Sequence, residues 1–216
     1  MIERGVLALI SDTHLYRAGL PIFFDLLRRH RITRLACLGD CEPEPFLDWL
    51  RLHPDNKLYW VYDVFWPDLP EATGSGMALA LAGRIFLAHT RATAFIYFKA
   101  PLAAYKNAPA SGRAPLLICH GHTHTPSVTR FGHSLNQILY INTASRFHSF
   151  QPRRALLQLS RDAVYLIVPG AFTLEEGRYP TFNFSLVDLQ NHAVEMFSIK
   201  NIKELDAIES SLPIFQ

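Results

Sequence analysis

Residues 5–15, GVLALISDTHL, decide the fold, because a short apolar run leads directly into the polar triplet Asp12-Thr13-His14. An unbroken apolar run of this length is typical of a strand that is buried on both faces of its sheet. Similar runs, separated by stretches with helical character, occur at 34–38, 57–62, 84–88 and 115–119. This alternation predicts an α/β architecture.

The stretches between these runs predict helices. LPIFFDLLRRHRI (20–32) has apolar residues at helical spacing and its cations late, which favours a helix C-terminus there. Residues 45–52 and 93–105 are further helix candidates, and Pro101 should kink or end the second.

Beyond residue 126 the chain changes character and becomes β-rich. Short polar turns separate the apolar segments 138–142, 154–159, 163–168, 182–189 and 193–199, while 169–181 is expected to be a surface loop. We expect these strands to be antiparallel. The length predicts one domain over residues 1–216, with a β-rich C-terminal part from about residue 146.

The composition excludes several classes of protein. Charged residues make up 19% and hydrophobic residues 49% of the 216 residues, which excludes a disordered chain. A net charge of +2 argues against a nucleic-acid-coating protein and against a polybasic membrane patch. No apolar run is long enough to span a bilayer, and Cys37, Cys41 and Cys119 fit buried thiols better than a disulfide framework. We therefore expect a soluble, cytoplasmic protein.

Polar clusters follow four of the apolar runs. They are Asp12-Thr13-His14, Gly39-Asp40, His89, and Gly121-His122-Thr123-His124. In an α/β sheet the carboxyl ends of the strands form the edge where ligands bind, so these clusters should meet at one place.

The residue types in these clusters are those of a metal site. In extended chain, residues i and i+2 point to the same face, so Asp12 and His14 can reach one centre, and so can His122 and His124. Glycine in two clusters allows a tight turn or a close approach to a metal. Imidazole with carboxylate suits Zn, Mn, Fe or Ni. Each cluster alone has an ordinary structural explanation, a turn or a buried histidine; their joint occurrence at strand ends favours metal.

In this order the motifs resemble those of the calcineurin-like metallophosphoesterases, and among these the small bacterial and archaeal phosphodiesterases. The family pattern runs D-x-H, G-D, G-N-[H/C]-[D/E], a later lone His, and G-H-x-H. The likeness covers residues 5 to about 145, where INTAS (141–145) resembles the family's Asn-Pro-Gly-Ser turn with two changes. It implies a sandwich of two β-sheets flanked by helices.

The resemblance also implies an activity, the hydrolysis of phosphate esters, phosphodiesters in particular, by a hydroxide that bridges two divalent ions. Asp40, His89 and His122 would then carry catalysis, with a small-molecule phosphate ester as the substrate. By the same resemblance the ligands form two sets: Asp12, His14 and His124 on one metal, and His89 and His122 on the other, with Asp40 bridging both.

One motif departs from the family pattern. Where the family has Gly-Asn, the register puts Asp63 at the glycine and Val64 at the asparagine, and valine cannot bind a metal. Either Asp63 shifts by a residue and supplies a carboxylate, or the second metal site is weak or empty; Asp68 is a further substitute. An added Asp63 carboxylate would cancel the net positive charge of the centre and weaken phosphate binding.

Several alternatives stay open. The retained histidines favour an enzyme, whereas the missing asparagine favours a catalytically weak or inactive relative that serves as a protein-binding scaffold; a single-metal hydrolase is a third hypothesis. Arg146 and Arg153 are candidates to bind the substrate phosphate, because guanidinium suits that geometry, although a plain surface role is equally open. His120 should point away from the ligand residues. The chain beyond 146 could form a lid, complete a sheet or provide a dimer surface, so a homo-oligomer is also an open expectation.

Overall fold

Two β-sheets form the centre of the fold in the computed structural model, which describes residues 5–63, 68–107, 114–131, 138–142, 153–173 and 181–199. The first sheet has the spatial order β10 (Arg153–Gln158), β14 (Ala193–Ile199), β13 (Thr181–Asp188), β1 (Val6–Ile10), β2 (Arg34–Cys37), β3 (Lys57–Val61) and β4 (Gly74–Gly76), and β12 (Phe172–Thr173) pairs with β13. The second has the order β5 (Ala78–Leu81), β6 (Ile85–Ala88), β7 (Leu116–His120), β11 (Val164–Val168), β8 (Ser127–Phe131) and β9 (Ile138–Asn142).

All ten strands predicted from apolar runs are present, each with bounds within one residue of those predicted. The strands that the sequence did not predict are β4, β5, β8 and β12. Of these, β4 has the sequence Gly-Ser-Gly and β12 has two residues, so neither carries an apolar pattern, and pairing with a neighbouring strand alone defines them. The expectation that 169–181 is entirely loop is therefore wrong at β12.

The C-terminal strands complete both sheets. β13 pairs antiparallel with β1, and β14 and β10 extend that sheet, whereas β11 inserts between β7 and β8 in the second sheet. Among the described strands beyond residue 126 every pairing is antiparallel, as expected, including that of β11 with β8. On its other side β11 runs parallel to β7 of the N-terminal half, with Val164 opposite Leu116. A strand that returns to the same sheet after an intervening strand can be parallel, and sequence patterning alone does not reveal this.

Four helices lie in the described part of the chain: α1 (Leu20–Arg29), α2 (Pro43–Arg51), α3 (Arg91–Tyr97) and α4 (Lys99–Asn107). α1 ends with Arg28 and Arg29 in its last turn, as predicted. The expected single helix over 93–105 is instead two helices, which meet at Phe98 rather than at Pro101. Pro101 lies in the first turn of α4, where a backbone N–H would have no helical partner in any case.

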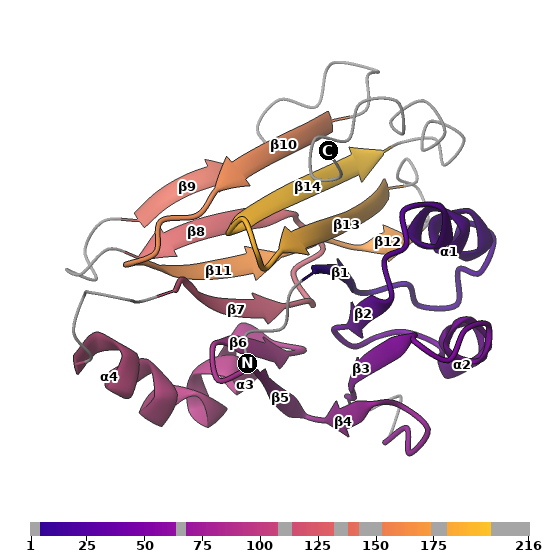
Figure 1. Ribbon diagram of the computed structural model, residues 1–216, viewed down its shortest axis with the longest axis horizontal. Coiled ribbons are helices and arrows are strands. Elements are labelled where there is room, and N and C mark those ends of the chain that lie inside the picture. The colour runs from indigo at the N-terminus through magenta and orange to yellow at the C-terminus, as the bar shows by residue number, and fades with distance from the viewer. Residues whose placement is uncertain are drawn as a thin grey trace.

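The buried side chains form layers on both sides of each sheet. In β1, Ala8 and Ile10 pack toward α1 and α2, while Leu7 and Leu9 pack against the second sheet. A third cluster of buried side chains lies between the second sheet and the helices α3 and α4. Figure 1 shows α3 beside β6 of that sheet. Burial on both faces explains why the central strands have continuous apolar runs instead of alternation. The structure is thus the predicted two-sheet sandwich flanked by helices.

Cys37, Cys41 and Cys119 are buried and free, which confirms the prediction of buried thiols. Among the helices that the structure describes, none has both the length and the apolar character that crossing a bilayer requires.

Candidate metal centre

Six candidate ligand side chains gather where the carboxyl ends of β1, β2, β6 and β7 meet. Their donor atoms form two groups, and within each group all donor atoms lie within 4.8 Å of one another. The Asp12 group consists of Asp12, His14 and His124, and the Asp40 group consists of Asp40, His89 and His122. The residues therefore gather in the same sets that the family resemblance implies, while their roles stay predictions.

Backbone hydrogen bonds bring the loops after β1 and β2 together. The amide of Asp12 donates to the carbonyl of Gly39 at 3.0 Å, and the amide of His14 donates to the carbonyl of Asp40 at 2.8 Å. The parallel pairing of the two strands thus continues beyond their ends. This continuation places the two sequence motifs side by side.

The carboxylate of Asp12 connects the two sheets. It is fully buried; its Oδ2 accepts a hydrogen bond from the Ser11 hydroxyl at 2.5 Å and another from the backbone amide of His122 at 2.9 Å. Gly121 makes this approach possible, because a Cβ there would lie 1.8 Å from Ser11 Oγ. Ser11 is not among the residues predicted from the sequence, although a hydroxyl next to a carboxylate at the end of a strand is a usable signal.

Five of the six candidate ligands have left-handed backbone conformations. The φ angles are 54° at Asp12, 47° at His14, 50° at Asp40, 67° at His122 and 56° at His124. Each such residue costs about 1–3 kcal/mol, and Asp and His tolerate the conformation better than most residues. The expected extended backbone is therefore wrong at both motifs.

This backbone conformation also separates the two histidines of the Gly-His-x-His motif. His122 joins the Asp40 group, and its ring centroid lies 5.1 Å from that of His89. His124 joins the Asp12 group, 5.3 Å from the ring of His14 by the same measure. One short loop thus contributes a ligand to each group, so the two groups are neighbours.

The imidazole of His89 has a defined orientation. Its Nδ1 lies 2.7 Å from the carbonyl oxygen of Leu38, and since that oxygen can only accept, Nδ1 carries the proton. The other nitrogen, Nε2, lies 3.4 Å from Asp40 Oδ2 and keeps its lone pair for a ligand. Gly39 (φ +93°) makes room for the ring, because a Cβ there would lie 2.3 Å from His89 Nδ1.

Asp63 lies beside the Asp40 group but does not belong to it. Its Oδ2 accepts a hydrogen bond from the backbone amide of Asp40 at 2.5 Å, and it is in neither group of converging donors. Of the other residues at the altered motif, Val64 lies outside the described residues. Asp68 is exposed, and its Oδ1 accepts from the amide of Leu69 at 3.0 Å.

Negative charge accumulates around Asp40. Burial is the main cause that raises the pKa of the Asp40 carboxyl; His89 opposes this rise, and the carboxylates of Asp63 and Asp12 add to it. A carboxylate that burial and two neighbouring carboxylates make costly to ionise is stabilised by a nearby cation.

The donor set fits divalent cations. Each group offers imidazole nitrogens and a carboxylate oxygen, the ligands of Zn, Mn, Fe and Ni. Bonds of about 2.0–2.2 Å to one ion hold its donors within roughly 4.4 Å of one another. The observed limit of 4.8 Å is close to that value, so small side-chain movements would complete either group.

His120 lies on the other face of β7, as predicted. It shares the face of Leu116 and Ile118, which pack toward α3 and α4, and it is buried. Its Nδ1 lies 2.8 Å from the carbonyl oxygen of Gly121, and burial lowers the pKa of its imidazole, with a smaller contribution from the charge of Arg91. It is thus a structural neighbour of the candidate centre and not a member of either group.

Of the two arginines predicted to bind phosphate, only Arg153 lies in the described part of the chain, and its backbone is remote from the candidate centre. Arg146 lies outside the described residues. Arg153 starts β10, where its backbone pairs with Ser198 three strands away from β1, a separation of about 14 Å at the usual strand spacing. Asn142, the second residue of INTAS, ends β9, and 143–145 lie outside the described residues.

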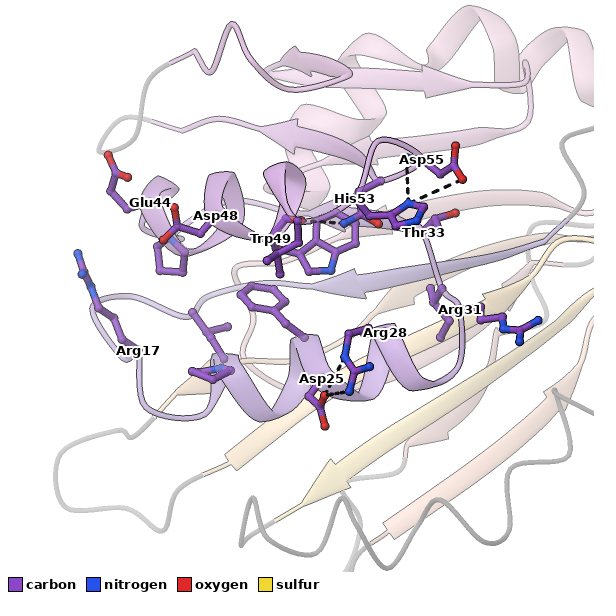
Figure 2. A pocket seen from close by; sticks show the side chains of 17 residues that line it. Arg17, Asp25, Arg28, Arg31, Thr33, Glu44, Asp48, Trp49, His53 and Asp55 are labelled. Carbon is purple, nitrogen blue, oxygen red and sulfur yellow. Dashed lines mark hydrogen bonds and ion pairs between the residues drawn. The ribbon is translucent and has the colours of Figure 1, made fainter.

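A separate groove of about 850 Å³ lies between α1 and α2. Its walls include the rings of Phe24 and Trp49, whose centroids are 6.2 Å apart. At its rim Arg28 pairs with Asp25, and on the opposite wall His53 contacts Asp55 (Figure 2). None of the candidate ligands lines this groove, so it does not belong to the candidate metal centre.

No protein-family model and no curated protein matches this chain. Solved structures do. The crystal structure of a metallophosphoesterase from Sphaerobacter thermophilus matches 98% of this chain and 96% of its own, with a TM-score of 0.51 and 16% identity. At this identity the likeness shows a shared fold.

Two further solved structures match with lower TM-scores. The phosphoesterase YfcE from E. coli covers 88% of this chain and 96% of its own, with a TM-score of 0.45 and 14% identity. A predicted phosphoesterase from Streptococcus pneumoniae TIGR4 covers 92% and 99%, with a TM-score of 0.39 and 11% identity.

Proposed function

We propose that this protein is a metal-dependent phosphoesterase that hydrolyses small-molecule phosphodiesters at the Asp12 and Asp40 groups. The observation that carries the proposal is the convergence of six donor side chains, from four strand ends in two sheets, into two groups of three. Its fold, shared with a metallophosphoesterase from Sphaerobacter thermophilus, supports the same activity.

Each of the two groups would hold one ion. The Asp12 group would hold one ion, with the Asp12 carboxylate fixed by the Ser11 hydroxyl and the His122 amide. The Asp40 group would hold the other, with His89 Nε2 aimed by the Leu38 carbonyl. Two divalent ions supply an acidified water and stabilise the charge on the phosphoryl oxygens. By the family resemblance Asp40 would help to hold both ions, and the contribution of Asp12 to the raised pKa of the Asp40 carboxyl shows that the two groups adjoin there.

The immediate surroundings favour esters with good leaving groups. His89 and His122 are both members of the Asp40 group, so their ring nitrogens would bind an ion and not carry a proton to a leaving group. We therefore expect aryl phosphodiesters to react much faster than alkyl ones. A cytoplasmic location is part of the proposal, and the three free, buried cysteines favour it.

Metal content and turnover of the purified full chain test the proposal. We expect two equivalents of Mn²⁺ per chain and hydrolysis of bis(4-nitrophenyl) phosphate that requires the added metal. One equivalent with residual activity would support a single-metal hydrolase instead. Protein that binds no metal and hydrolyses no ester would support the protein-binding scaffold, and our proposal would be wrong.

A further inference from the structure

Arg91 is close in the chain to the candidate ligand His89 and, among the residues that the structure describes, forms no ion pair with a carboxylate. It follows His89 by two residues and starts α3, a helix that begins immediately beyond His89 because the Thr90 side chain accepts a hydrogen bond from the amide of Thr93 at 3.1 Å. Two residues span at most about 7 Å between Cα atoms. The long side chain of Arg91 is thus attached within reach of the space beside His89.

The guanidinium of Arg91 contacts an aromatic ring. Its Cζ lies 5.6 Å from the centroid of Phe95, one helical turn further on, and the arginine is exposed. A guanidinium that stacks on a ring uses its face, and its N–H groups remain in its plane for an oxygen acceptor. Since the ring also limits the positions of the side chain, less entropy is lost when an anion binds.

Another arginine near the candidate ligands already forms an ion pair. Arg17 follows His14 by three residues, and both Nε and an Nη of its guanidinium donate to the carboxylate of Glu42. In the described residues Arg91 forms no such ion pair. Of the two guanidinium groups, that of Arg91 is the one that no carboxylate of the described ranges holds.

We propose that Arg91 is a substrate-binding residue, whose guanidinium, held against Phe95, binds a non-bridging oxygen of a phosphodiester at the Asp40 group. This inference rests on the proposed function and adds a residue to it. The ligand is a phosphate oxygen because arginine donors match the geometry of phosphate, in one or two hydrogen bonds, and their charge is opposite to that of the substrate.

The test compares four variants of the metal-loaded full chain, with bis(4-nitrophenyl) phosphate as the substrate and inorganic phosphate as a competitive inhibitor. In Arg91→Gln we expect KM and the phosphate Ki to rise about 10- to 100-fold, the effect of losing a charge-assisted hydrogen bond, with a smaller change in kcat. Arg91→Lys should recover part of the loss, and Phe95→Leu should raise KM by a smaller factor. Metal content should stay at the wild-type value in all of them.

Arg161→Gln is the matched control. Arg161 is an exposed arginine in the turn before β11, which runs parallel to β7, so it lies at the opposite end of the sheet from the centre. Its KM and Ki should equal those of the wild type.

The possible failures are distinguishable. Wild-type protein without metal-dependent turnover defeats the proposed function and this inference together. An active wild type with unchanged KM and Ki in Arg91→Gln overturns this inference alone. Loss of metal in both Arg91→Gln and Arg91→Lys would show a structural role for Arg91 and would also overturn it.

Discussion

His89 Nδ1 donates a hydrogen bond to the carbonyl oxygen of Leu38 at 2.7 Å, and this bond joins the end of β6 in the second sheet to the loop after β2 in the first. It determines the tautomer of His89 and directs Nε2 toward Asp40. A bond between the two sheets therefore sets the geometry of the Asp40 group.

Two substitutions at His89 separate these contributions. Asparagine has its amide nitrogen near the position of Nδ1, so His89→Asn should keep the bond to Leu38 and lose the metal ligand. We expect its metal-free form to unfold with a free energy close to that of wild type, and the loaded protein to lose about one equivalent of metal. His89→Gln should instead remove the imidazole donor from the Leu38 carbonyl, which keeps only the longer 3.3 Å hydrogen bond from the Ser11 hydroxyl, at a cost of about 1 kcal/mol of stability. Metal analysis and urea unfolding measure both effects, and an Asn variant with two tightly bound equivalents would contradict the role of His89.

Gly121→Ala should damage the fold at the centre. A Cβ at residue 121 would lie 1.8 Å from Ser11 Oγ and 2.9 Å from the carbonyl oxygen of Leu38, and backbone cannot move aside cheaply. We expect a loss of about 3 kcal/mol in unfolding free energy, at the upper end for an overpacked site, together with weaker metal binding. Gly74→Ala is the control: its Cβ would meet Tyr59 at an ordinary 3.7 Å, so its stability should change by less than about 1 kcal/mol. Equal stabilities of the two variants would disprove the steric explanation.

The sequence predicts the strands and the identities of the gathered residues better than it predicts the backbone that gathers them. Asp12 and His14 are adjacent in a motif, and strand ends meet at a sheet edge, so their convergence follows from general rules. The left-handed conformations at both residues do not, because they occur where the amides of Asp12 and His14 donate to the carbonyls of Gly39 and Asp40, in the loop that follows another strand. The same limit applies to β11: its parallel pairing with β7 is determined by the tertiary fold and not by the local sequence.

Asp63 illustrates a different limit of sequence reasoning. The altered motif leaves two alternatives, that Asp63 supplies a carboxylate to the second metal or that this site is weak or empty. In the structure Asp63 accepts a hydrogen bond from the Asp40 amide, a role that neither alternative includes. That interaction holds the turn that presents Asp40. It links residues 23 positions apart, and no rule of sequence spacing predicts such a bond.

Replacing Asp63 tests charge and hydrogen bonding separately. Asp63→Asn keeps an oxygen that can accept from the Asp40 amide but removes one negative charge near the centre. We expect KM for an aryl phosphodiester to fall about three- to tenfold, because less negative charge repels the substrate. Asp63→Ala removes the hydrogen bond as well, so it should also lower metal affinity at the Asp40 group. An unchanged or higher KM in Asp63→Asn would show that the charge of Asp63 does not weaken substrate binding.

Metal binding should stabilise the folded chain, and this effect can be measured without any substrate. At an Mn²⁺ concentration of 100 times its Kd, each occupied site adds about 2.7 kcal/mol to the unfolding free energy. For a chain of this length that corresponds to a rise in Tm of about 5–10 °C per site, which EDTA should reverse.

Asp40→Asn should lose most of this rise, because it removes a charged ligand. Its metal-free form should be at least as stable as the metal-free wild type, since the substitution relieves the repulsion of Asp40 by the carboxylates of Asp12 and Asp63. Asp55→Asn, in the exposed turn between α2 and β3, is the matched control and should keep the full rise in Tm. If Asp40→Asn were stabilised by Mn²⁺ as much as the control, the Asp40 group would not be a metal site. If its metal-free form were much less stable than wild type, the Asp40 carboxylate would be a structural anchor instead of a group that needs a cation.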